Sequence, residues 1–188
     1  MSFWQNSGLQ PKRKFRYLVV FGGNTTDPMT VAVKTTEKPK FEIGNTPYKF
    51  LNHQFHFPNR LVWQPLAMTL VDHLGDGDVF NSVTGRLFKI IEGSGYINPA
   101  AGTSFEACKT AITKAAATTA LGKVHIQQLA DLQGGSVRTE VVETWTLHNA
   151  FINNINFGDL SYDDDGLVEI SLTLVYDYAT LAKDFTKP

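Results

Sequence analysis

The sequence predicts a mainly β (α+β) protein, built as a two-sheet antiparallel β-sandwich or barrel with helices inserted centrally and packed on its flank. Two observations lead to this prediction. Apolar and polar residues alternate in several runs of the first and last thirds of the chain, which is the period of strands that place one face on a core. In the middle third, apolar residues recur at spacings of three and four, which is the period of helices.

The first third holds the first expected strands. In the run Phe15 to Phe21 every second residue is apolar or aromatic, and Gly22-Gly23-Asn24 ends the run with a turn. Thr30 to Thr36 is a second β-prone run. Both segments are therefore expected to lie in a sheet.

A polar segment interrupts this pattern. Lys38 to Pro47 carries prolines at both Pro39 and Pro47 and is expected to be a loop. Phe50 to Phe57 and Leu61 to Val71 then resume strand-like composition, with Pro58-Asn59 as the expected turn between them.

Two helices are expected in the middle third. Asp78 is the expected N-cap of the first, in which Phe80, Val83, Leu87, Ile90 and Ile91 share a face. Thr103 and Glu106 form a capping box for the second, an Ala-rich run follows, and Gly122 is placed to end it. Its buried stripe is predicted to consist of Phe105, Cys108, Ile112 and Ala116.

The last third returns to strands, at Lys123 to Leu132, Val137 to Phe151 and Leu167 to Tyr178. The final run alternates most cleanly. Asp163-Asp164-Asp165-Gly166 supplies a turn before it. Its expected core face holds Val168, Ile170, Leu172, Leu174, Tyr176 and Tyr178, and its polar face Glu169, Ser171, Thr173 and Asp177.

Length and composition limit the class of protein. The 188 residues suffice for one domain, 1–188, of which 1–13 is expected to be an extended N-terminal arm. The formal net charge of -1 lacks the basic excess of a phosphate-binding protein. One cysteine, Cys108, permits no internal disulfide. Neither a secretory signal nor a run of roughly 20 apolar residues is found, so synthesis and folding in the cytoplasm are expected.

No catalytic, cofactor-binding or metal-binding residues are predicted, and the chain is not expected to be an enzyme. His53 and His56 are three residues apart, but in a strand they point to opposite faces. The run Asp163 to Gly166 lacks the alternate acids and closing Glu of a calcium loop. Cys108 is expected to be a buried apolar group. The short basic run Lys12-Arg13-Lys14 suits a solvated strand start, a contact with a neighbouring subunit or a nucleic-acid arm.

The C-terminal third carries the most specific motif. Trp145 to Phe151 is followed by a Gly-containing bend, Ile155 to Tyr162, and then by a strand that ends in Tyr176-Asp177-Tyr178. This order resembles the tail tube proteins of contractile-tailed bacteriophages, which are related in fold to the type VI secretion tube protein. Phe15 to Phe21 and Thr35 to Pro39 agree with the front half of that family.

The resemblance implies a structural subunit of a phage tail tube, in which hexameric rings stack into a hollow conduit for passage of the genome during infection. Its partners would be further copies of itself and the tail sheath, baseplate and tail terminator proteins. DNA would pass transiently and without specific binding, and the chain would not insert into a membrane. The subunit would be made and assembled in the host cytoplasm and reside in the tail of the virion.

By the resemblance, the N-terminal arm, the loop after the second strand and the C-terminus bridge successive rings. The expected contact residues are Phe3, Trp4 and Leu9 in the arm and Lys38, Phe41 and Ile43 after the second strand. By the resemblance, neighbouring subunits join their sheet edges into one wall, and open edges are otherwise a hazard for a monomer. The strand face with Glu169, Ser171 and Thr173 would lie on either the lumenal or the outer side.

Two other readings stay open. The chain would serve equally as the tube subunit of a type VI-like secretion system or of a phage-derived bacteriocin. A small-ligand-binding β-barrel is a further alternative, and it would require a monomer with an apolar internal cavity.

Deletion of Ser2 to Gln10 should leave a folded protein that assembles poorly, because the aromatic residues of the arm are then missing from the contact with a neighbour. Electron microscopy of the purified protein across a concentration series measures this. Cys108→Ser, expected to assemble normally, is the control, and normal tubes from the deletion would show that the arm is dispensable.

Overall fold

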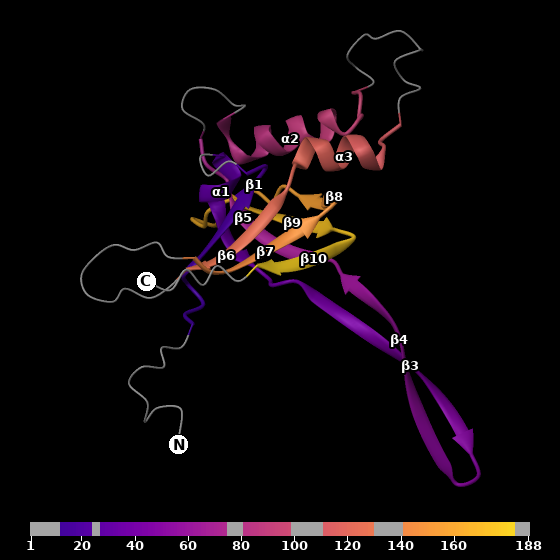
Figure 1. Ribbon diagram of the computed structural model, residues 1–188. Coiled ribbons are helices and arrows are strands. Elements are labelled where there is room, and N and C mark those ends of the chain that lie inside the picture. Colours follow the sequence, from indigo (N-terminus) through magenta and orange to yellow (C-terminus); the bar gives the residue numbers. More distant parts are fainter. Residues whose placement is uncertain (1–11, 24–26, 75–80, 99–110, 130–140, 183–188) are drawn as a thin grey trace, which may run out of the picture.

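The computed structural model describes residues 12–23, 27–74, 81–98, 111–129 and 141–182 (Figure 1). Two four-stranded antiparallel sheets form the body within these residues. The first sheet has the order β1 (Tyr17–Phe21), β6 (Val124–Leu129), β7 (Val141–His148) and β10 (Tyr178–Ala182). The second has the order β2 (Val33–Thr36), β5 (Leu66–Val71), β9 (Glu169–Val175) and β8 (Phe151–Asn156).

The two sheets share one apolar core. The first sheet supplies Val19, Phe21, Val124, Ile126 and Leu147, and the second supplies Leu66, Met68, Leu70, Ile170, Leu172 and Leu174. Because these residues alternate along each strand with more exposed ones, the sheets pack face to face. The predicted fold class, mainly β with two antiparallel sheets, is confirmed.

Three helices cover one side of the sheets in the described part of the chain: α1 (Pro28–Ala32), α2 (Val83–Gly93) and α3 (Lys114–Leu121). Figure 1 shows α2 and α3 side by side above the strands. They approach closely, since a Cβ on Gly93 would lie 3.2 Å from the Cβ of Ala120. Leu87, Ile90 and Leu121 join the core from these helices. The two longer helices, α2 and α3, are thus central in the sequence and lie on the flank, as predicted, whereas α1 in the first third was not predicted.

The helix starts differ from the prediction. Ser82, not Asp78, caps α2, accepting a hydrogen bond from the N–H of Gly85 at 3.1 Å, and Thr113 caps α3 by accepting from Ala116 at 3.2 Å. Gly122 ends α3 as predicted. Ile112, expected in the buried stripe, precedes the helix and is exposed. Several predicted helix residues lie outside the described residues, namely Asp78, Phe80, Thr103, Phe105, Glu106 and Cys108.

Some predicted strands are divided. Thr30 to Thr36 contains the end of α1 followed by β2, because Asp27 caps a helical turn by accepting from the N–H of Met29 at 3.0 Å. The expected strand Val137 to Phe151 holds β7 and the start of β8, which belong to different sheets. Asn149, with φ of 54°, turns the chain from one sheet to the other.

Asp177 fixes the place where two chain segments cross between the sheets. Its backbone N–H donates to the carbonyl of His148 at 3.0 Å, and its carboxylate accepts from Asn149 Nδ2 at 2.8 Å. Lys114 Nζ, at the start of α3, donates to both carboxylate oxygens at 2.7 Å. The bond from Lys114 and the bond from Asn149 lower the pKa of Asp177. The Tyr176-Asp177-Tyr178 motif therefore has a structural basis at this corner.

A long two-stranded ribbon leaves the body between β2 and β5 (Figure 1). It consists of β3 (Lys40–Phe50) and β4 (His53–Gln64), joined by Leu51 and Asn52. The predictions of a loop at Lys38 to Pro47 and of a turn at Pro58-Asn59 are therefore wrong. Each strand of a two-stranded ribbon has one edge without a partner, and proline is tolerated there because its missing N–H is not needed for pairing.

Leu172→Asp should prevent folding, because Leu172 is 1% exposed and the carboxylate would be buried without a partner. Ser171→Asp is the matched control, since the neighbouring side chain points to the exposed face of the same strand. Circular dichroism melting distinguishes the two variants. A cooperative transition for Leu172→Asp would show that this side chain does not need an apolar environment.

Candidate functional site

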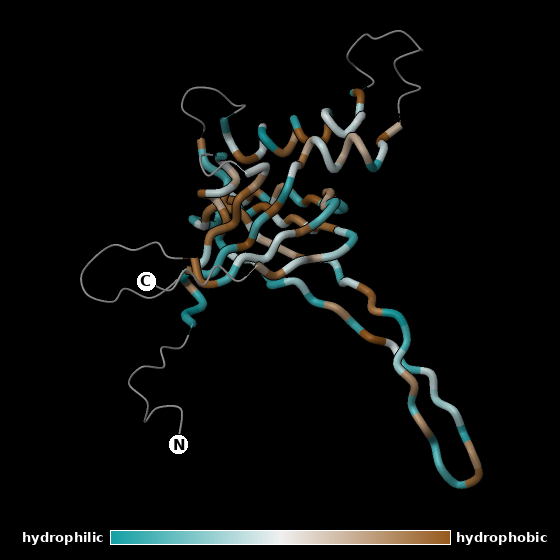
Figure 2. Tube along the Cα trace, viewed as in Figure 1, coloured by the Kyte–Doolittle hydropathy of each residue, from teal (hydrophilic) through white to brown (hydrophobic). Residues whose placement is uncertain are grey.

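Exposed apolar side chains gather on the hairpin of β3 and β4. Figure 2 shows the hairpin projecting from the body with hydrophobic segments along its length. An isolated two-stranded hairpin is marginally stable in water at best, and a row of exposed aromatic residues marks a surface that another molecule covers. The exposed residues are Phe41, Ile43, Tyr48, Phe50, Leu51, Phe55, Phe57, Leu61 and Val62.

The apolar residues of the hairpin form two patches. Near the body, Phe41 pairs with Trp63 and Ile43 pairs with Leu61, and we call these four residues the proximal patch. Nearer the turn, Thr46 pairs with Phe57, Tyr48 with Phe55 and Phe50 with His53. We call Tyr48, Phe50, Phe55 and Phe57 the distal patch. Directly opposed residues point to the same face of a ribbon, so each patch occupies one face.

A β-bulge separates the two patches. Ile43 pairs with Leu61 but Asn45 pairs with Pro58, so Asn59 and Arg60 together oppose Gly44. Along β3 the side chains alternate, and Ile43 and Tyr48 therefore point to opposite faces. The proximal patch and the distal patch thus lie on opposite faces of the ribbon.

The turn of the hairpin presents an apolar residue in an unusual backbone conformation. Leu51 has φ of 53° and is 89% exposed. A non-glycine residue with positive φ is uncommon, and bulky residues pay a steric cost there. Neither packing nor a favourable backbone within the described residues accounts for leucine at this position.

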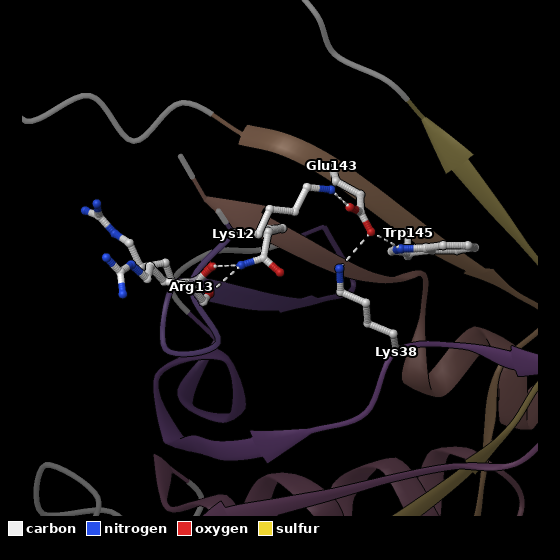
Figure 3. Close-up of polar contacts among 7 residues, drawn as sticks. Lys12, Arg13, Lys38, Glu143 and Trp145 are labelled. Atoms are coloured by element: carbon white, nitrogen blue, oxygen red, sulfur yellow. Dashed lines mark hydrogen bonds and ion pairs between the residues drawn. The ribbon is translucent and has the colours of Figure 1, made fainter. Parts of the chain in front are cut away.

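Glu143 ties the base of the hairpin to the first sheet (Figure 3). Its carboxylate accepts from Lys38 Nζ at 2.9 Å and from the indole Nε1 of Trp145 at 2.5 Å, and it also pairs with Lys12. Lys38 lies between β2 and β3, and Lys12 lies at the end of the predicted N-terminal arm. One carboxylate thus holds both segments that were predicted to contact a neighbour.

The electrostatics of this cluster follow from its burial. Glu143 is 9% exposed, and burial alone would raise its pKa. The hydrogen bonds from Lys12, Lys38 and Trp145 outweigh that effect and lower the pKa to about 2. The side chains of both lysines remain about half exposed, so they bring charge to Glu143 without being buried themselves.

Gln128 adds a second polar connection beside Glu143, its neighbour across the β6–β7 pair. Its Nε2 donates to the carbonyl of Arg13 at 2.8 Å and to that of Arg16 at 2.7 Å (Figure 3). Both carbonyls belong to the segment that leads into β1. The start of the described chain is therefore held by backbone as well as side-chain contacts.

Aromatic contacts continue from the proximal patch into the core. The rings of Phe41 and Trp63 meet edge to face with centroids 5.3 Å apart, and those of Trp63 and Tyr176 lie 5.9 Å apart. Tyr176 belongs to the buried core. The first residues of the hairpin are thereby fixed to the body, whereas the distal patch has no such connection among the described residues.

The predicted assembly residues fall into two groups. Lys38 is at the hairpin base on Glu143, and Phe41 and Ile43 are in the proximal patch. Phe3, Trp4 and Leu9 lie outside the described residues. The prediction omitted the distal patch and Leu51, although Tyr48 and Phe50 alternate on one side of Leu51-Asn52 and Phe55 and Phe57 on the other. This symmetry about a two-residue turn was the available hairpin signal.

Among the described residues, no group of three or more His, Cys, Asp or Glu side chains is arranged to hold a metal ion. In the same residues no helix has the length and apolar character needed to cross a membrane. His125 accepts or donates a hydrogen bond with Thr146 at 2.9 Å, and burial lowers its pKa.

No family model matches the sequence, and no curated protein matches it either. Solved structures do match. A chain in the extended sheath–tube complex of an extracellular contractile injection system (PVC) has a TM-score of 0.63 and 15% identity, over 97% of this chain and 99% of that chain.

Two matches come from the anti-feeding prophage. A chain in its baseplate structure has a TM-score of 0.60 and 14% identity, over 93% of this chain and 97% of that chain. A chain in its tube-terminating cap has a TM-score of 0.57 and 16% identity, over 93% and 92%. The chain therefore has the fold of components of contractile machines, and the predicted resemblance is confirmed at the level of the fold.

Glu143→Gln should lower the free energy of unfolding at pH 7 on the order of 2 kcal/mol, because the charge shared by Lys12, Lys38 and Trp145 is lost. The pKa of Glu143 falls from 4.5 to about 2 on folding, so its contribution is complete above about pH 4.5 and disappears as the pH falls through 2. Urea unfolding at several pH values should therefore show the two proteins converging in acid.

The control for this measurement is Glu37→Gln, which removes a pair with Lys40 that is exposed on both sides. Its effect should stay within about 0.5 kcal/mol at any pH. If the difference in free energy of unfolding between wild type and Glu143→Gln is the same at pH 2 as at pH 7, the assigned role of the carboxylate is contradicted.

Proposed function

We propose that this chain is a structural tube subunit of a contractile tail, and that it works by self-assembly and not by catalysis. In this proposal residues 1–188 act as one tube domain with residues 1–13 as an extended arm. Hexameric rings stack into a hollow conduit, and the tube meets sheath, baseplate and terminator proteins. The subunit resides in the tail of a virion, after synthesis in the host cytoplasm, and DNA passes through the tube without specific binding.

The single observation that carries the proposal is the exposed apolar hairpin. A monomer gains nothing by holding an aromatic ribbon in water, whereas a subunit of a polymer buries it against a neighbour. The anchoring of the hairpin through Lys38 and Trp63 supports the same role, since a contact element must be held in a fixed direction. The likeness of the fold to components of contractile machines adds support.

The open sheet edges fit this proposal. In the described part of the chain, β1 and β10 are the edge strands of the first sheet, and β2 and β8 are the edge strands of the second sheet. Edge strands carry unpaired backbone groups that another chain can join. Within a ring, neighbouring copies would extend one another's sheets by this route.

A second candidate is the tube of an injection particle that delivers proteins instead of a genome. The observation that favours it is the likeness to chains from the anti-feeding prophage and from an extracellular contractile injection system. Particles isolated from the source of the gene distinguish the two: nuclease-protected DNA inside them supports the phage tail, and its absence supports the injection particle.

Replacing Tyr48, Phe55 and Phe57 by Ser should leave the fold intact and raise the protein concentration needed for tube formation by about tenfold or more. Each aromatic side chain contributes about 1.5 to 3 kcal/mol when buried in a contact, and 1.4 kcal/mol corresponds to tenfold in affinity. Negative-stain electron microscopy across a concentration series reports rings and tubes.

The matched control replaces Asn45, Gln54 and His56 by Ser on the opposite face of the same part of the hairpin. We expect these substitutions to raise the protein concentration needed for tube formation less than the aromatic substitutions do. Uniform small particles from the wild-type protein at every concentration, with or without preformed tail baseplates, would overturn the proposed function.

A further inference from the structure

Two lysines from distant parts of the chain share the carboxylate of Glu143. Its Oε2 pairs with Lys12, which belongs to the segment before β1. Its Oε1 accepts from Lys38 Nζ at the base of the hairpin at 2.9 Å (Figure 3). The indole of Trp145 also donates to Oε1, at 2.5 Å, but it is neutral. One negative charge therefore serves two cations.

The carboxylate is the fixed member of this group. The side chain of Glu143 is 11% exposed, whereas those of Lys12 and Lys38 are 51% and 48% exposed. Either ammonium group can therefore leave for water or for another acceptor at modest cost, while Glu143 stays in place on β7. The occupancy of Glu143 can change without a change in the body.

A hollow of about 330 Å³ separates the two segments beside this group. The segment before β1 lines it with Lys14, and the chain that leads to the hairpin lines it with Thr36 and Lys38. Trp145 lines it as well. A space of this size admits water, so Lys38 can shift relative to the segment before β1 without disturbing a packed contact.

Like charges at this site oppose each other. Two ammonium groups that are bonded to the two oxygens of one carboxylate lie no more than about 8 Å apart. Charges at that separation repel, and salt at physiological strength, with a screening length of about 8 Å, only reduces the repulsion. Departure of Lys12 therefore strengthens the pairing of Lys38 with Glu143.

We propose that Lys12 and Lys38 compete for Glu143, so that the hairpin base is held weakly while Lys12 is bound and firmly once Lys12 has left. The competition is reciprocal: whatever fixes Lys38 on Glu143 also weakens the hold on Lys12. In the tube, Lys12 would leave Glu143 when the N-terminal segment engages another copy, and the hairpin base would then become firm. Copies would thus add in a defined order.

Only this last step rests on the proposed function, because it names another copy of the chain as the partner that takes up Lys12. The competition itself is a property of a single chain. It can therefore be measured on the unassembled protein, at a concentration where sedimentation velocity shows monomers.

Hydrogen exchange at the hairpin base tests the competition. Lys12→Met removes one competitor and keeps the apolar stem, so the amides of residues 40–43 and 61–64, which pair at the base, should exchange about threefold more slowly. Amides near the turn, in residues 48–55, are an internal reference and should not change. Lys14→Met is the matched control, since Lys14 lines the hollow but forms no ion pair within the described residues.

Two further measurements show whether Glu143 is the link. In a Glu143→Gln background, Lys12→Met should no longer slow exchange at the base, because the shared charge is missing. In urea unfolding, the variant that carries both Lys12→Met and Lys38→Met should be destabilised more than the two single variants predict. The excess factor in the unfolding equilibrium constant should be about threefold.

The outcomes separate this inference from the proposed function. Unchanged or faster exchange at the base in Lys12→Met, or slower exchange that persists in the Glu143→Gln background, would overturn the competition, whether or not the wild-type protein forms tubes. Slower exchange that depends on Glu143, in a protein that never forms rings or tubes, would support the competition and count against the tube.

Discussion

Glu143 is a buried carboxylate that the fold can keep ionised only by surrounding it with donors. Lys12, Lys38 and Trp145 supply them, and each comes from a different part of the chain. If one donor is absent, the others must compensate for the burial of the charge. The direction of the chain where it enters the first sheet at β1, and where it leaves β2 of the second sheet towards β3, is thereby linked to a single side chain. The direction of the projecting hairpin depends on that link, because Lys38 at the base of the hairpin binds Glu143 of the first sheet.

The body of the protein could be predicted from its sequence because its strands keep a simple alternation. Ile170, Leu172, Leu174 and Tyr176 are all buried, as the pattern in β9 indicated, and Tyr178 is exposed because the chain has by then passed to the other sheet. That passage could not be foreseen, since the apolar alternation continues through Asp177 and only the contacts with Asn149 and Lys114 show a corner.

The hairpin was missed although aromatic residues alternate on both sides of Leu51-Asn52, because two prolines favoured a different interpretation. Pro47 and Pro58 carry the ordinary signals of a loop and a turn, and local sequence does not reveal that a strand has a free edge where proline is harmless. Lys38, Phe41 and Ile43 remain predicted assembly residues, and their contacts within the chain differ: Lys38 binds Glu143 at the base of the hairpin, whereas Phe41 packs on Trp63. The cluster around Glu143 also joins residues more than one hundred positions apart, which no local pattern reports.

The bulge opposite Gly44 has a consequence for how such a ribbon can change its length. Because side chains alternate, two residues added to each strand beyond the bulge would preserve the side on which Tyr48 and Phe55 appear, while one residue would exchange the two sides. The tolerated lengths of the ribbon should therefore differ by an even number of residues in each strand. Spacing between successive copies would then vary in discrete steps of about 7 Å, the rise of two strand residues, and could not be tuned continuously.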